Sequence, residues 1–226
     1  MPGPALMTRI APTQPRTSLR CTNQAYRRQP PMARGDKPLA ASTYGWSTPL
    51  RVFILYANPV AASFGATLHK QVVTTLRSRG HEIDDCDLYT ESFDPVMGEQ
   101  ERMQYHNAEL NWAPIAAYAD RLLAAEALVL IYPVWNEGFP AILKGFFDRV
   151  FVPGVSFTLG PDGAPVPNLQ KLRKLAAVGT YGASRATSFL LGDPPKRVVQ
   201  TRGAFDARPR HSLQLPRILR YGSFQP

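Results

Sequence analysis

Cysteine is scarce in this chain of 226 residues: only Cys21 and Cys86 are present, and they form no CxxC pair. A disulfide scaffold and a thiolate zinc site are therefore not expected, and a reducing compartment is the default. The four histidines form no HxxxH or HExxH pattern, so no metal site is predicted. No uninterrupted apolar run reaches the ~18 residues that a membrane span needs. Hydrophobic residues still make up 44% of the chain, which excludes wholesale disorder.

Acidic residues are nearly missing from both ends of the chain. Residues 1–50 and residues 196–226 each contain 7 Lys+Arg and 1 Asp, whereas residues 51–195 contain 12 Lys+Arg and 15 Asp+Glu. The formal net charge of +9 therefore belongs to the ends, and the middle of the chain is mildly acidic. A duplex-binding domain is expected to carry positive charge on the fold itself, so we expect no nucleic-acid partner.

Residues 1–49 are rich in proline and arginine and contain no apolar signal core. We interpret them as a basic extension that is disordered, with Met7 or Met32 as alternative starting points of the chain. The same composition is typical of an Arg-rich, acid-poor transit peptide. We therefore predict a cytoplasmic protein, with organelle targeting as the alternative if residues 1–49 are a transit peptide.

From Leu50 onward, short apolar runs alternate with amphipathic stretches. The apolar runs predict strands at residues 52–56, 82–88, 127–132 and 175–179. The amphipathic stretches predict helices that follow Ser63, that span residues 114–125, and that begin at Pro140. This βαβαβαβ alternation predicts the α/β class and a three-layer, doubly wound parallel sheet with strand order 2-1-3-4-5.

Three unusual loops follow strands 1, 3 and 4, at residues 58–64, 133–140 and 180–184. In the predicted strand order these strands are neighbours, so the loops converge on one edge of the sheet. The first loop offers a hydroxyl and a positive helix end, which suit a phosphate. The second offers an aromatic wall for a flat ring, and the third a glycine that permits close approach. Together they indicate a mononucleotide-like cofactor, flavin above all, although each alone is typical of a cap, a packed aromatic or a turn.

Three motifs carry a resemblance to a known family: residues 140–151 (PAILKGFFDRVF), residues 87–89 with 93–96, and residues 192–195 after the turn at 180–182. Through them, residues 51–195 resemble the NAD(P)H:quinone oxidoreductase group of flavodoxin-like flavoproteins. The resemblance implies a flavodoxin-like flavin-binding domain over residues 50–195 and a homodimer. It also implies a bound flavin, FAD in preference to FMN, and two-electron reduction of quinones by NADH or NADPH.

The resemblance also implies roles for single residues. Residues expected to contact the pyrophosphate of the cofactor are Asn58, Ser63 and Phe64. Residues expected to contact the isoalloxazine ring are Pro133, Val134, Trp135 and Asn136. Residues expected to contact the edge of the isoalloxazine ring are Thr180, Tyr181, Gly182 and Ala183. No catalytic acid is implied, because residues 184–193 contain neither tyrosine nor histidine.

The C-terminal segment, residues 196–226, departs from this pattern. A fifth strand and a closing helix are expected there, but the segment is basic and its one apolar stretch, residues 213–219, is interrupted by Pro216. We therefore interpret this segment as an atypical, truncated form of the fifth strand and fifth helix. Two alternatives to an enzyme stay open: a non-catalytic or truncated flavodoxin-like accessory protein, for example a regulatory partner of a transport system, and a simple flavin electron carrier.

Overall fold

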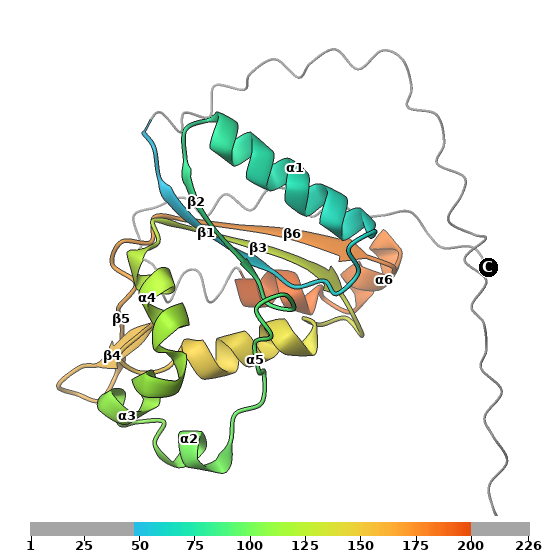
Figure 1. Ribbon diagram of the computed structural model, residues 1–226. Helices are drawn as coiled ribbons and strands as arrows, with labels where there is room; N and C mark the ends of the chain where they lie inside the picture. Colours follow the sequence, from blue (N-terminus) through green and yellow to red (C-terminus); the bar gives the residue numbers. More distant parts are fainter. Residues whose placement is uncertain (1–47, 200–226) are drawn as a thin grey trace, which may run out of the picture. The chain divides into compact units, whose positions relative to one another are not determined.

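The computed structural model describes residues 48–199 of the chain, and all structural statements refer to that part (Figure 1). The basic extension predicted for residues 1–49 lies almost entirely outside the described residues, as does the segment after Val199. No helix within residues 48–199 has both the length and the apolar character needed to cross a membrane.

A parallel sheet of four strands forms the centre of the structure, with the order β2-β1-β3-β6. Its strands are β1 (Arg51–Tyr56), β2 (Glu82–Asp87), β3 (Ala127–Val134) and β6 (Lys174–Tyr181). This order confirms the first four positions of the predicted order 2-1-3-4-5. Within residues 48–199 there is no fifth strand beside β6. Val198 and Val199 lie in a helical segment, residues 194–199, and not in a strand.

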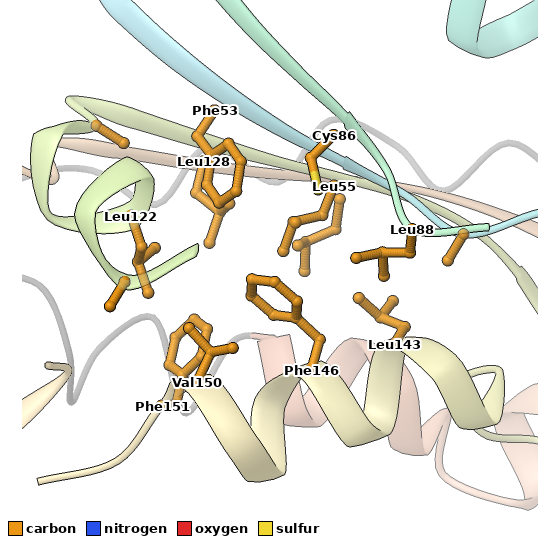
Figure 2. Close-up of a cluster of buried hydrophobic side chains, with 14 of the residues drawn as sticks. Phe53, Leu55, Cys86, Leu88, Leu122, Leu128, Leu143, Phe146, Val150 and Phe151 are labelled. Atoms are coloured by element: carbon orange, nitrogen blue, oxygen red, sulfur yellow. The ribbon is translucent and has the colours of Figure 1, made fainter. Parts of the chain in front are cut away.

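Helices cover both faces of the sheet, which confirms the three-layer architecture (Figure 1). On one face lies α1 (Phe64–Ser78); on the other lie α4 (Ala116–Ala124) and α5 (Ala141–Val150). The strands alternate accordingly: Val52 and Ile54 pack in the core on the α1 side, and Phe53 and Leu55 in the core on the α5 side. Figure 2 shows Leu143, Phe146 and Val150 of α5 directed at the sheet.

The connections contain elements that the sequence did not predict. Three short helices precede α4: α2 (Glu99–Met103), α3 (Ala108–Trp112) and the 3₁₀ turn η1 (Ala113–Ile115). A two-stranded antiparallel hairpin, β4 (Phe157–Leu159) and β5 (Pro165–Pro167), fills the Gly/Pro-rich stretch after α5. A short helix, α6 (Arg185–Leu190), follows β6 and precedes the helical segment at residues 194–199.

The third strand was predicted to end at residue 132, before Pro133. This prediction is wrong by two residues, since β3 continues to Val134. The Ile131 carbonyl accepts a hydrogen bond from the Ala57 N–H (2.9 Å), so odd-numbered residues of β3 turn their backbone groups toward β1. β1 has already ended at Tyr56, opposite Ile131. At Pro133, therefore, β1 offers no strand residue that would accept a hydrogen bond from an N–H. The missing N–H of Pro133 costs nothing there, and Pro133 stays in register with Thr180 of β6.

Gly145 allows the loop after β2 to lie directly on α5. A Cβ atom built on Gly145 would overlap the backbone of Pro95. Arg149, one helical turn further along α5, also holds this loop through hydrogen bonds to the Asp94 carbonyl and to Glu101 (2.9 Å). The loop is thereby fixed against α5 by the close packing at Gly145 and by the hydrogen bonds of the Arg149 guanidinium.

We predict that Gly145→Ala destabilises the fold by roughly 3 kcal/mol, measured by chemical unfolding. The better helix propensity of alanine favours the variant by only about 1 kcal/mol and is outweighed by the overlap with Pro95. Lys144→Ala is the control: Lys144 is exposed and, among residues 48–199, forms an ion pair with Asp148 alone, so its loss should change stability by less than about 0.5 kcal/mol. Equal stabilities of the two variants would contradict this account of the Pro95 contact.

Candidate functional site

The segments that follow β1, β3 and β6 leave the sheet at the same edge. The three strands are parallel neighbours, with Tyr56 of β1 opposite Ile131 of β3 and Val134 of β3 opposite Tyr181 of β6. Parallel strands in this arrangement place their carboxyl ends together. The predicted convergence of the three loops on one edge therefore follows from the observed topology.

The first segment is a turn fixed by its own polar groups. The Asn58 Oδ1 accepts a hydrogen bond from the Val60 N–H (3.0 Å), and the Val60 carbonyl accepts one from the Ser63 N–H (3.0 Å). Ser63 then caps α1, because its Oγ accepts a hydrogen bond from the Ala66 N–H (3.1 Å). Ser63 is thus the helix cap that the sequence predicted.

The N-terminus of α1 carries a partial positive charge that no acidic residue of its first turn offsets. Gly65 leaves room beside this turn: a Cβ atom there would lie 2.8 Å from the Asn58 Nδ2, so the Asn58 amide rests against the helix. Phe64, at the first position of α1, remains 39% exposed. This end of α1 can therefore bind an anion.

Tyr56, the last residue of β1, lies in a hollow together with Asn58, Ala66 and His69. The sequence did not predict Tyr56 as a site residue. Its hydroxyl is buried and makes no hydrogen bond of normal geometry with the described residues. Burial raises the pKa of Tyr56, the nearby Ser63 hydroxyl lowers it, and the charge of Asp87 raises it further. The His69 ring stacks on the Tyr56 ring (4.2 Å between centroids), and the His69 Nε2 lies 2.7 Å from Asp85.

The second segment forms a tight hairpin turn after β3. Trp135 and Gly138 exchange two backbone hydrogen bonds (3.2 and 2.9 Å), and Asn136 and Glu137 between them have φ of +48° and +58°. Asparagine tolerates the left-handed conformation, whereas for glutamate it is strained. One carboxylate oxygen of Glu137 is also buried without a hydrogen-bond partner among the described residues. The turn presents Trp135 with 44% of its surface exposed.

The third segment begins later than the sequence suggested. Thr180 and Tyr181 are the last two residues of β6, not part of the following loop, and only Gly182 and Ala183 lie in the bend. Ser184 then leads into α6, where its Oγ accepts a hydrogen bond from the Thr187 N–H (3.2 Å). The Tyr181 side chain is buried, and its hydroxyl donates a hydrogen bond to the Asp193 Oδ1 (2.7 Å).

The predicted site residues are therefore placed at one edge, although not all in loops. Pro133, Val134, Thr180 and Tyr181 belong to strand ends, and the other predicted positions lie in or beside the three connections. Sequence reasoning did not predict Tyr56 as a site residue, and although Asp193 belongs to the motif at residues 192–195, its bond to Tyr181 was not predicted. Within residues 48–199, no group of three or more His, Cys, Asp or Glu could hold a metal ion.

The family is decided by a comparison with protein-family models, in which a model described as a flavodoxin-like fold matches residues 50–206. The chain belongs to the flavodoxin-like fold family. Among solved structures, this flavodoxin-like chain is 30% identical to Smu.1420 from Streptococcus mutans, with a TM-score of 0.62 and coverage of 74% of this chain and 86% of that one. An NAD(P)H:quinone oxidoreductase from Methanothermobacter marburgensis shares the fold at 22% identity and a TM-score of 0.63, covering 79% and 87% of the two chains.

Curated relatives of this flavodoxin-like chain carry the names of oxidoreductases. An uncharacterized NAD(P)H oxidoreductase of Escherichia coli, YcaK, is 30% identical over 57% of this chain and 64% of its own length. NAD(P)H dehydrogenase [quinone] 1 of Rattus norvegicus is 29% identical over 58% of this chain and 54% of its own. An FMN-dependent NADH:quinone oxidoreductase of Coprothermobacter proteolyticus is 31% identical over 47% and 53%. The chain thus spans between about half and just under two thirds of each of these relatives.

We predict that Glu137→Gly stabilises the protein by about 1 kcal/mol in thermal or chemical unfolding, because glycine relieves the strain at φ +58°. The matched control is Asn136→Gly at the adjacent left-handed position, where asparagine is already tolerated and the gain should stay below about 0.5 kcal/mol. A Glu137→Gly variant that is less stable than the wild type would show that the glutamate side chain supports the turn.

Proposed function

We propose that the chain is a flavin-dependent NAD(P)H oxidoreductase that reduces quinones or similar electrophiles by two-electron hydride transfer. The observation that carries the proposal is the position of a helix N-terminus without acidic residues in its first turn and an exposed tryptophan at one edge of a flavodoxin-like sheet. A flavin combines a phosphate with a flat ring and so matches both features. The oxidoreductase names of the relatives support the same activity.

The chain's own residues fit a flavin in three respects. The α1 N-terminus, with Asn58, Ser63 and Phe64, would hold the phosphate, and the unpaired hydroxyl of Tyr56 lies buried beside this turn. Pro133, Val134, Trp135 and Asn136 would line the ring. Backbone N–H groups of the segment from Thr180 to Ala183 would face the edge of the ring, where Gly182 permits close approach.

FMN is the flavin that we propose. The sequence resemblance favours FAD, but relatives whose names specify a flavin are called FMN-dependent. Identification of the flavin released from the denatured protein by chromatography tests this choice.

When bound, a flavin would supply two-electron hydride chemistry between NADH or NADPH and a quinone, and the one further proton that the hydroquinone needs would come from water. The role of the protein would be to bind the flavin and to orient it toward its substrates. The α1 N-terminus would hold the phosphate, Trp135 would line the ring, and the backbone donors near Gly182 would stabilise negative charge on it. No side chain is assigned as a catalytic acid.

We also propose a homodimer, as the family resemblance implies, and a cytoplasmic location, in keeping with the scarcity of cysteine; sedimentation of the purified chain tests the dimer. A non-catalytic, flavin-binding accessory protein is the second candidate. It is favoured by the outer edge of β6, which has no neighbouring strand within residues 48–199. A flavin that binds but is not reduced by either nicotinamide would favour this second function.

The decisive experiment is an absorbance spectrum of the purified chain with FMN or FAD, followed by anaerobic NADH or NADPH and then a quinone. We expect a bound flavin whose visible absorbance is lost on reduction and returns with the quinone. A chain that retains no flavin with either supplement would refute the proposal.

Ser63→Asp separates flavin binding from folding. Aspartate caps a helix as well as serine does, so stability should stay within about 0.5 kcal/mol, but its charge occupies the positive helix end and should weaken flavin binding about tenfold. Asn107→Asp is the matched control, because Asn107 caps α3 through the Glu109 and Leu110 N–H groups in the same way. Equal flavin affinities of these two variants would place the phosphate elsewhere.

A further inference from the structure

Tyr181 and Asp193 connect the two ends of the segment that contains the bend at Gly182. Tyr181 is the last residue of β6, and Asp193 follows α6. The Tyr181 hydroxyl donates to the Asp193 Oδ1 over 2.7 Å, and only 2% of the Tyr181 surface is exposed. A short bond to an ionised carboxylate is among the stronger hydrogen bonds in proteins. The segment from 182 to 192 is therefore closed into a loop at its base.

The backbone at Asp193 is adapted to this contact. Gly192 and Asp193 have φ of +76° and +50°, so two successive residues adopt the left-handed conformation. The Asp193 N–H donates to the Ser188 carbonyl (2.9 Å), and the Asp193 carbonyl accepts from the Arg197 N–H (3.1 Å). The left-handed turn thus aims the carboxylate at Tyr181 while its backbone joins α6 to the following helical segment. Glycine and aspartate both tolerate this conformation, and the hydrogen bonds around the turn fix its geometry.

The charge of the same carboxylate also acts on a second phenol. Tyr132 of β3 is buried, with 2% of its surface exposed, and both burial and the charge of Asp193 raise the pKa of Tyr132. Through its bond to Tyr181, Asp193 lies at the carboxyl end of β6, next to the site. Its contact with Tyr181 belongs to the edge of the sheet and not to a distant surface.

We infer that Tyr181 and Asp193 form a positioning pair, which holds the bend at Gly182 and Ala183 in the shape that the flavin ring requires. The inference rests on the proposed function. Glycine has no side chain through which its position can be fixed, so its place depends on its neighbours. Tyr181 immediately precedes Gly182 and is itself fixed by Asp193. Neither residue needs to touch the flavin to act in this way.

The pair should affect reduced flavin more than oxidised flavin. Reduction places negative charge on the ring, and backbone donors stabilise such charge best when they are held in place beforehand. Without the pair the donors must reorganise. We therefore expect the affinity for reduced flavin to fall about tenfold more than that for oxidised flavin, which lowers the two-electron midpoint potential by about 30 mV.

Three variants test the pair. Tyr181→Phe removes the hydroxyl and keeps the ring, and Asp193→Gly removes the carboxylate and keeps the left-handed backbone accessible. Both should show the lower midpoint potential and faster amide hydrogen exchange at residues 182–188. Asp193→Asn retains an acceptor and tolerates positive φ, so its potential should stay near that of the wild type. Tyr118→Phe is the control, because it also removes a phenol beside a carboxylate, that of Glu91, outside the site.

The measured potentials of these variants separate the inference from the proposed function. Potentials of Tyr181→Phe and Asp193→Gly equal to that of the wild type, with flavin bound, would overturn the inference and leave the proposed function standing. The same shift in Tyr118→Phe would show a general loss of stability and would also overturn it. A wild-type chain that binds no flavin would refute the proposed function and the inference together.

Discussion

The register of β3 against its two neighbours is the constraint on which the candidate site depends. β3 pairs with β6 over eight residues, from Ala127 to Val134, and with β1 only as far as Ile131. Both faces of β3 are buried, and a shift of one residue would exchange the larger set on the α5 side (Leu128, Leu130, Tyr132) with the smaller set on the α1 side (Ala127, Val129, Ile131), which would disrupt the packing of both cores. The same burial that stabilises the sheet therefore fixes the edge at which the three connections meet.

Several locally unfavourable features gather at this edge. Of the four non-glycine residues with positive φ within residues 48–199, Asn136, Glu137 and Asp193 lie in or beside the site. Buried atoms without a hydrogen-bond partner among the described residues include the Tyr56 hydroxyl and one oxygen of Glu137. The α1 N-terminus also lacks an acidic residue that would offset its charge. A fold selected for stability alone would remove these features, so their common location supports a ligand-binding role.

Much of the fold could be predicted from the sequence, because buried parallel strands and amphipathic helices have strong patterns. The run at residues 127–132 and the face of Leu143, Phe146 and Val150 are of this kind. Strand ends were harder: Pro133 stays in β3 only because β1 has already ended, which depends on the neighbouring strand. The β4–β5 hairpin contains two prolines in one strand of three residues, and its sequence lacks the usual alternation.

The convergence of the three connections on one edge was predictable for the same reason, since it follows from strand order. Its details depend on contacts between distant residues. A glutamate at φ +58° is not a recognised turn signal, so the turn at Asn136 and Glu137 has no sequence signature. The bond from Tyr181 to Asp193 joins residues twelve positions apart across α6, and no local pattern indicates it.

The central claim is that three separate connections form one flavin site, and hydrogen exchange with and without FMN tests it most directly. The account predicts that FMN slows amide exchange at residues 57–66, 134–139 and 180–184 together, while the β4–β5 hairpin is unaffected. Protection confined to one of these segments, or located elsewhere in the chain, would contradict it.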